Sequence, residues 1–125
     1  MSSSAGDPVP IDVPYTTESG RRVIDACALA RHLEGLLGTH ATADVAATAQ
    51  ATLADGLAAI AIEEAADRDL HAVGFTGGVA YNDAIFCRIR DRVESSGLRF
   101  LSPSAVPPGD AGISYGQAVV AAATM

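Results

Sequence analysis

Two short stretches of this sequence combine glycines with polar residues where a strand is expected to turn into a helix. The first runs from His71 through an apolar segment and Thr76-Gly77-Gly78 to Asn82. The second passes through two prolines and Gly109 and starts a helix at Asp110. In open α/β sheets, ligands bind where the carboxyl ends of strands meet helix starts. Thr76-Gly77-Gly78 can expose backbone N–H groups at that edge, and such a loop accepts phosphate.

Each of these residues also has a purely structural interpretation. A glycine pair after a strand fits a simple turn as well as a phosphate loop. Asn82 and Asp110 both fit the N-cap of the helix that follows them. The local pattern alone leaves both interpretations open.

The elements that must position these stretches follow from the apolar periodicity. It predicts a helical hairpin followed by a β-α-β-α arrangement with a small parallel sheet, which is an α/β fold. The predicted helices are residues 21–37, 42–68, 83–96 and 113–124, and the predicted strands are residues 71–75 and 98–101.

At 125 residues the chain forms one domain, for which we expect residues 15–125. Residues 1–14 are rich in Ser, Gly and Pro and are expected to be a mobile tail, with 11–13 able to form an edge strand. Cys27 and Cys87 lack metal-binding spacing and are expected to be buried free thiols.

The charge balance is acidic, with eight arginines, no lysine and a formal net charge of −7. A duplex nucleic-acid partner is therefore not expected, because no basic stripe is present. No signal peptide is visible, and the uncharged run from Ala111 to Met125 is too short to span a bilayer, so we expect a cytoplasmic protein without a membrane partner.

The C-terminal helix, residues 113–124, carries no charge, which predicts burial on several sides. Few strands can be found for a parallel sheet, which needs more neighbours and two covered faces. Both observations predict self-association into a homo-oligomer or a partner chain.

Taken together, Phe-Thr-Gly-Gly-Val-Ala-Tyr-Asn (75–82) and Val-Pro-Pro-Gly-Asp-Ala-Gly-Ile-Ser-Tyr-Gly-Gln (106–117) resemble the C-terminal end of HypF, the family of hydrogenase-maturation carbamoyltransferases. The related tRNA threonylcarbamoyladenosine synthases are more distantly similar. The likeness covers residues 43–122. In that family this region is the second lobe of an actin/sugar-kinase/Hsp70-like (ASKHA) nucleotide-binding domain.

The resemblance implies that Gly77, Gly78 and Asn82, with Thr76 beside them, lie against the phosphate and ribose of ATP or carbamoyl-adenylate. It also implies that Asp110 is a ligand of a divalent metal ion, a role that suits a carboxylate. The full-length enzymes use carbamoyl phosphate and ATP, and pass the carbamoyl group to a C-terminal cysteine of a partner protein in nickel-iron hydrogenase maturation.

The sequence departs from the family pattern in several places. The first lobe, with its His-x-x-x-His metal pair, and the adenylate-forming domain are missing. Gly109 stands where the family has Asn, and Ala111 stands where it has Gly. We therefore expect no catalysis by the isolated chain, and a partner that carries the first lobe or acts in hydrogenase maturation. The alternative is a non-catalytic module that binds a nucleotide or a partner, or serves in oligomerisation.

Overall fold

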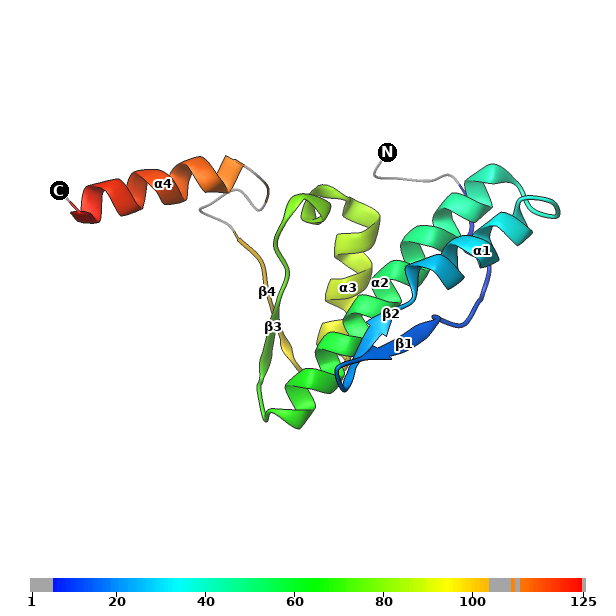
Figure 1. The fold of residues 1–125 in the computed structure, drawn as a ribbon, viewed down its shortest axis with the longest axis horizontal. Coiled ribbons are helices and arrows are strands. Elements are labelled where there is room, and N and C mark those ends of the chain that lie inside the picture. Colours follow the sequence, from blue (N-terminus) through cyan, green and yellow to red (C-terminus); the bar gives the residue numbers. More distant parts are fainter. Residues whose placement is uncertain (1–5, 104–108, 110, 125) are drawn as a thin grey trace.

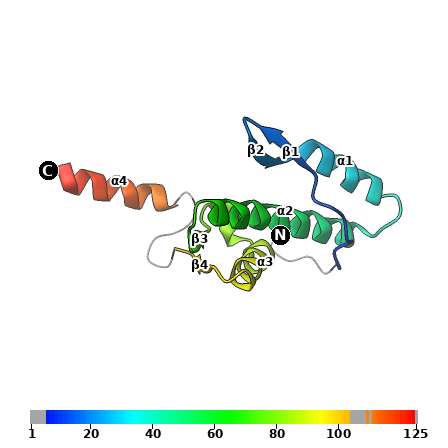
Figure 2. The same cartoon turned by 90° about the horizontal axis from the view of Figure 1, so that it is seen from below.

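The computed structural model describes residues 6–103, 109 and 111–124 (Figure 1). In chain order the elements are β1 (Tyr15–Glu18), β2 (Arg21–Ile24), α1 (Ala26–Leu36), α2 (Thr42–Asp67), β3 (Ala72–Gly74), the 3-10 helix η1 (Gly78–Tyr81), α3 (Asp83–Ser95), β4 (Arg99–Leu101) and α4 (Ala111–Thr124). The predicted helical hairpin is confirmed, because α1 and α2 run side by side in opposite directions (Figures 1 and 2). The expected α/β class is confirmed as well.

A β-hairpin stands where the sequence predicted the first turn of a helix. Strands β1 and β2 pair antiparallel, with Tyr15 opposite Ile24. Ser19 and Gly20 form the turn, with φ of 51° and 79°. Two residues with positive φ match the twist of a two-residue hairpin, so this Ser-Gly pair reverses the chain and does not start a helix. Helix α1 starts later, where the Asp25 carboxylate accepts the N–H of Ala28 at 3.0 Å.

Helix α2 is the centre of the domain. It contacts α1, β2, β3 and α3, and nine of its residues are buried: Val45, Ala47, Thr48, Ala51, Thr52, Ala54, Gly56, Ala58 and Ala65. By length and composition it could also cross a membrane. In this structure part of its apolar surface packs inside the domain, while Leu57 remains 39% exposed. Most of the buried residues are small, which lets the neighbouring elements approach α2 closely.

Strands β3 and β4 form the predicted parallel pair, with Val73 beside Phe100, and α3 connects them. The core lies between this pair, α2 and α3, and consists of Ala54, Ala58, Ile85, Ile89 and Val93. Phe75 and Phe100 pack against it from the strand side, and Phe86 of α3 lies next to both rings. The ring of Phe86 lies edge-on to Phe100 at 5.3 Å between centroids, and Phe75 lies 6.2 Å from Phe86. Helix α3 is thereby fixed against both strands.

The N-terminal segment lies along α2 in its described part, residues 6–14. The Asp7 N–H donates to the Asp44 carboxylate at 2.9 Å, and the Val9 N–H donates to the buried Thr48 hydroxyl at 2.7 Å. No strand forms at residues 11–13, so that expectation is wrong. The division into a mobile tail (1–14) and a domain (15–125) stays a prediction.

Helix α4 extends away from the other elements (Figures 1 and 2). Its large side chains are exposed; for example, Ile113 is 61% and Val120 is 64% exposed. The predicted burial of this helix is therefore wrong for the single chain, because no element among the described residues covers it. Cys27 and Cys87 are free but exposed, which corrects their expected burial.

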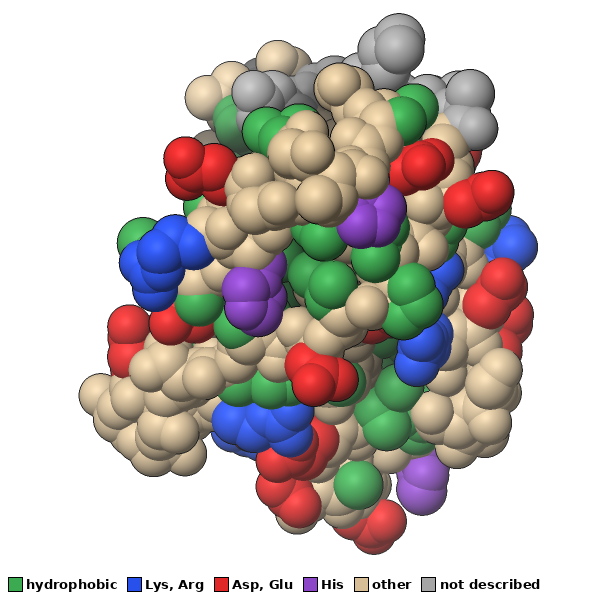
Figure 3. All heavy atoms as spheres, turned by 90° about the vertical axis from the view of Figure 1, so that its right-hand side faces the viewer, with side chains coloured by type: hydrophobic (Ala, Val, Ile, Leu, Met, Phe, Trp, Pro, Cys, Tyr) green, Lys and Arg blue, Asp and Glu red, His purple; other side chains and the backbone are tan. Residues whose placement is uncertain are grey.

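The surface is mixed in character. On the face in Figure 3, apolar side chains are visible between scattered acidic and basic ones. The Arg22 guanidinium covers the Tyr15 ring at 3.9 Å and pairs with Glu63, so one of the eight basic residues is engaged within the β-hairpin and α2.

Candidate functional site

The loop after β3 has the open backbone that a phosphate loop needs. The Phe75 N–H still pairs with the carbonyl of Leu101 at 3.0 Å, and the chain then leaves the sheet through Thr76. Gly77 has φ 108° and ψ 175°, a conformation that side chains rarely adopt. A Cβ added at Gly77 or Gly78 would meet no atom within 4 Å. Ligand atoms can therefore approach the backbone of this loop.

The sequence indicated that the glycine pair leads into the helix, but in the structure the pair does not lead directly into α3. The 3-10 helix η1 comes between them, and it begins with the Ala80 N–H donating to the Gly77 carbonyl at 3.0 Å. The positive end of the α3 dipole therefore lies at Asn82 and not at the glycines. A phosphate at the glycine loop would be held mainly by backbone N–H groups.

Asn82 caps α3. Its side-chain oxygen accepts the Ile85 N–H at 3.1 Å, and its backbone is extended with φ −82° and ψ 107°. The structural interpretation of this residue is thus confirmed. Its role toward a nucleotide is a separate question, because a helix cap can also face a bound anion.

Gly109, which precedes α4, lies close to the end of η1. Gly109 is so close to Tyr81 that a Cβ on the glycine would lie 2.7 Å from ring atom Cε2. The Gly109 carbonyl accepts the N–H of Gly112 at 3.0 Å as α4 begins. The structure therefore brings the two predicted stretches into contact. Asp110, the predicted metal ligand, lies outside the described residues.

Within the described ranges, no three His, Cys, Asp or Glu side chains come together as a metal site would require. The described residues therefore do not fit a metal ion by themselves. Structural zinc sites use four protein ligands and catalytic zinc sites three. Asp110 as a ligand stays a prediction that needs other ligands.

A charged cluster that the sequence analysis did not identify joins α2 to α3. The Asp55 carboxylate accepts hydrogen bonds from Nε and Nη2 of Arg88 at 2.6 and 3.0 Å. It also forms an ion pair with Nη2 of Arg92 at 3.0 Å. The hydrogen bonds from Arg88 to Asp55 raise the pKa of Arg88. Partial burial of Arg88 opposes this rise, and the negative charge of Asp55 adds to it. Arg88 and Arg92 are four residues apart and therefore lie on one face of the helix. This spacing was the signal in the sequence from which the charged cluster could have been predicted. This cluster holds α3, and with it Asn82, against α2.

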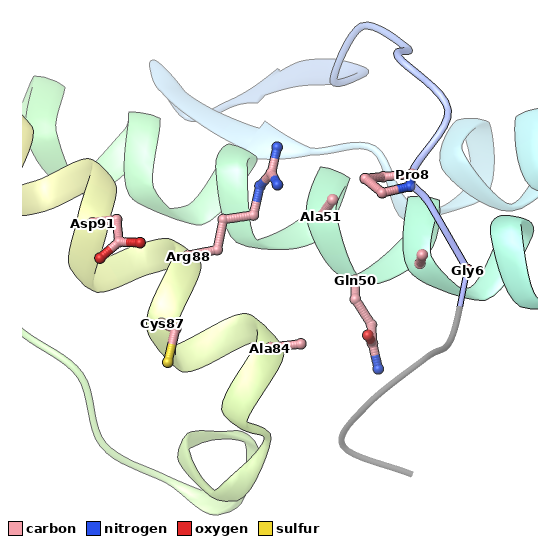
Figure 4. Close-up of a pocket in the computed structure, with 9 residues that line it drawn as sticks. Gly6, Pro8, Gln50, Ala51, Ala84, Cys87, Arg88 and Asp91 are labelled. Atoms are coloured by element: carbon pink, nitrogen blue, oxygen red, sulfur yellow. The ribbon is translucent and has the colours of Figure 1, made fainter.

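Two hollows, each of about 380 Å³, lie elsewhere on the domain. One is polar and lies between the N-terminal segment, α2 and α3; Figure 4 shows Pro8, Gln50, Cys87, Arg88 and Asp91 around it. The other is apolar and lies between β2, α1 and α2, where Leu29 and Leu53 contribute to its lining. The predicted residues Thr76, Gly77, Gly78 and Asn82 line neither hollow.

Comparison with known proteins finds relatives among carbamoyltransferases and tRNA threonylcarbamoyltransferases. The sequence matches the family described as "Carbamoyltransferase, Kae1-like Domain, second subdomain" over residues 3–117. It is 38% identical over 86 residues to the probable carbamoyltransferase HypF of Methanocaldococcus jannaschii. It is 41% identical over 71 residues to the tRNA N6-adenosine threonylcarbamoyltransferase of Trichodesmium erythraeum. These alignments cover 69% and 57% of this chain but 11% and 22% of those proteins.

Solved structures of HypF contain the same fold. The crystal structure of T. kodakarensis HypF matches 90% of this chain with a TM-score of 0.76 and 34% identity. A full-length HypF in its phosphate- and nucleotide-bound form matches 97% with a TM-score of 0.78 and 26% identity. The matched region is 14% and 16% of those chains. The resemblance stated from the two glycine stretches is thereby confirmed, and this chain belongs to the HypF carbamoyltransferase family, in which it corresponds to the second subdomain of the Kae1-like domain.

Proposed function

We propose that this chain forms one wall of a nucleotide site, at which Thr76, Gly77, Gly78 and Asn82 hold the phosphate and ribose of ATP or carbamoyl-adenylate. The observation that carries the proposal is the match of 97% of the chain to a HypF in its phosphate- and nucleotide-bound form. The open glycine loop supports it, because no side chain blocks the backbone there. The reaction served would be carbamoyl transfer to a cysteine of a partner protein in nickel-iron hydrogenase maturation.

The glycine loop would act through its backbone. Gly77 has a positive φ, and a Cβ added at Gly77 or Gly78 would meet no atom within 4 Å, so the space beside both glycines is open. Phosphate oxygens accept hydrogen bonds from backbone N–H groups at close range. The Asn82 side chain, at the start of α3, would face the same ligand from the helix end.

The rest of the site would come from outside the described residues. Because the chain spans 14–16% of the matched HypF structures, we propose that a region equivalent to their first lobe, on this or another chain, supplies the opposite wall. Asp110 would contribute one carboxylate to a divalent metal ion, with further ligands from that lobe. Catalytic zinc sites use three protein ligands, and Mg²⁺ is held by one or two carboxylates together with substrate phosphates. With one carboxylate and without the opposite wall, we expect no ATP turnover by these 125 residues alone.

The replacement Asn82→Asp tests the proposal. Aspartate caps a helix as well as asparagine, so the free energy of unfolding is expected to change by less than about 0.5 kcal/mol. A carboxylate beside phosphate is repulsive, however, and we expect ATP binding, followed by calorimetry, to weaken about tenfold or more. Asp25→Asn makes the reverse exchange at the cap of α1 and is the control, for which ATP binding should not change. Equal ATP affinity of wild type and Asn82→Asp would leave Asn82 as a helix cap only.

A second candidate function is association without nucleotide chemistry. The observation that favours it is α4, whose Ile113, Tyr115, Val119 and Val120 are all more than half exposed. Exposed apolar surface of this kind is typical of a protein interface. Under this alternative, the wild-type chain would bind no ATP, and its mass in solution would exceed that of one chain.

A further inference from the structure

We infer that two copies of this chain form a dimer in which α4 of each copy lies in an apolar groove of the other. The groove is the apolar hollow of about 380 Å³ between β2, α1 and α2. The inference rests on the association named above as the second candidate function, and it identifies the surface that α4 contacts. It does not depend on whether the chain binds ATP.

The groove offers an apolar surface that is open to another element. The apolar side chains that line it include Val23, Ile24, Leu29, Leu53, Leu57 and Ile60. Leu53, Leu57 and Ile60 follow one another at four and three residues, so they form one row along α2. Leu57 is 39% exposed although its neighbours in the groove are apolar. An apolar row that water still reaches is typical of a surface that a partner covers.

The charge at the groove is already paired within the chain. Among the residues that line the groove, Arg22 carries a charge. Its guanidinium pairs with Glu63 and lies 3.9 Å from the centre of the Tyr15 ring. The occupant therefore needs no charge, and a charged one would lose water without gaining a partner. Helix α4 meets this condition, because residues 111–124 contain no charged side chain.

One face of α4 is complementary in shape to the row on α2. Ile113, Gly116 and Val120 lie three and four residues apart, so they share a helix face. Ile113 is 61% and Val120 is 64% exposed, and a Cβ added at Gly116 would meet no atom within 4 Å. The glycine leaves a depression between two branched side chains. A side chain of the size of Leu57 fits such a depression when two helices pack ridge into groove.

The arrangement of the elements favours a groove on a second copy. Helix α4 extends from the side of the domain opposite to α1 (Figures 1 and 2). The groove lies beside α1, so α4 is away from the groove of its own chain. Another copy carries the same groove without this separation.

The area that α4 can bury favours a symmetric exchange. With 14 residues α4 is about 21 Å long and about 10 Å wide, and half of its surface is about 330 Å². Two helices in two grooves therefore bury about 1,300 Å² in total, which is within the range of stable interfaces. One helix in one groove would bury about half of that area, which is the size of a crystal contact. A twofold dimer with both grooves filled is thus the stable arrangement.

The test is the mass of the 125-residue chain in solution, measured by light scattering at micromolar concentration. The wild type is expected at twice 12.7 kDa. Leu57→Glu puts a charge in the groove and Val120→Arg puts one on α4, and each should raise the dimer Kd about 100-fold or more. Leu70→Glu, at a residue that is 52% exposed, and Ala118→Arg, on the opposite face of α4, are the matched controls and should stay dimeric.

Mixing the two weakened variants tests the exchange directly. A mixed dimer of Leu57→Glu and Val120→Arg chains has one unchanged contact and one in which the introduced carboxylate meets the introduced guanidinium. The mixture should therefore recover the mass of two chains. A measurement without variants supports it: on dilution of the wild type, the methyl NMR signals of Leu53 and Leu57 should shift together with those of Ile113 and Val120.

The outcomes separate this inference from the candidate function on which it rests. A wild-type mass of one chain would overturn both. A dimer that Leu57→Glu or Val120→Arg does not weaken, a mixture that does not recover, or methyl shifts in α4 without shifts in the groove would overturn the inference alone. An assembly of more than two chains would do the same, and association through another surface would then stand.

Discussion

Replacing Val93 by alanine is expected to lower the free energy of unfolding by about 2 kcal/mol. Val93 is fully buried in α3 and packs in the core with Ile85, Ile89, Ala54 and Ala58. The facing residues on α2 are alanines, which have no side-chain length with which to fill the space that valine leaves. The higher helix propensity of alanine offsets about 0.6 kcal/mol of the loss.

Urea unfolding followed by far-ultraviolet circular dichroism measures this change, since the chain contains no tryptophan. Val119→Ala is the matched control, because it makes the same exchange in a helix at a residue that is 52% exposed. We expect its stability to stay within about 0.5 kcal/mol of the wild type. Equal losses in both variants would contradict the position of the core between α2 and α3.

Replacing Asp55 by alanine is expected to cost about 1–2 kcal/mol of stability. It leaves Arg88 and Arg92 close together without the carboxylate that now pairs with both of them. Hydrogen bonds between charged groups are stronger than neutral ones, but the Arg88 side chain is 39% exposed and solvent weakens the interaction. Because this cluster orients α3, the same variant should also weaken ATP binding at Asn82.

A cycle of Asp55→Ala, Arg88→Ala and the double variant isolates the coupling between the two residues. Glu64→Ala is the control, since it removes an exposed pair with Arg68 four residues along α2, and its expected cost is below about 0.5 kcal/mol. A coupling of zero between Asp55 and Arg88 would show that the ion pair does not hold the two helices together.

The parts of the fold that could be predicted have strong local signals. Helix α3 was expected at residues 83–96 and is Asp83–Ser95, since Asn82 caps its start and Gly97, with φ 83°, ends it. Helix α2 was expected at 42–68 and ends one residue earlier. The two strands around α3 were likewise recognisable as apolar runs bounded by glycine or polar residues.

The parts that were wrong depend on contacts that a local pattern does not contain. Ser19-Gly20 resembles a helix start, and only the pairing of Tyr15 with Ile24 across it shows that it is a hairpin turn. The uncharged sequence of α4 predicts a covering surface, but composition does not say whether the chain itself supplies that surface. The turn at the glycine pair was recognisable from its residues, and Gly77 has a φ of 108° there. The closeness of Tyr81 and Gly109 was not recognisable, because 28 positions separate them and no periodicity connects them.

The measurement that tests the central claim most directly is a titration of the chain with ATP, followed at each backbone amide by NMR. We predict that the amide signals of Thr76, Gly77, Gly78 and Asn82 shift first and furthest, and that those of Gln50 and Cys87 in the polar hollow stay unchanged. Shifts confined to that hollow, or no shift at millimolar ATP, would contradict the claim that this loop is the nucleotide-binding wall of the subdomain.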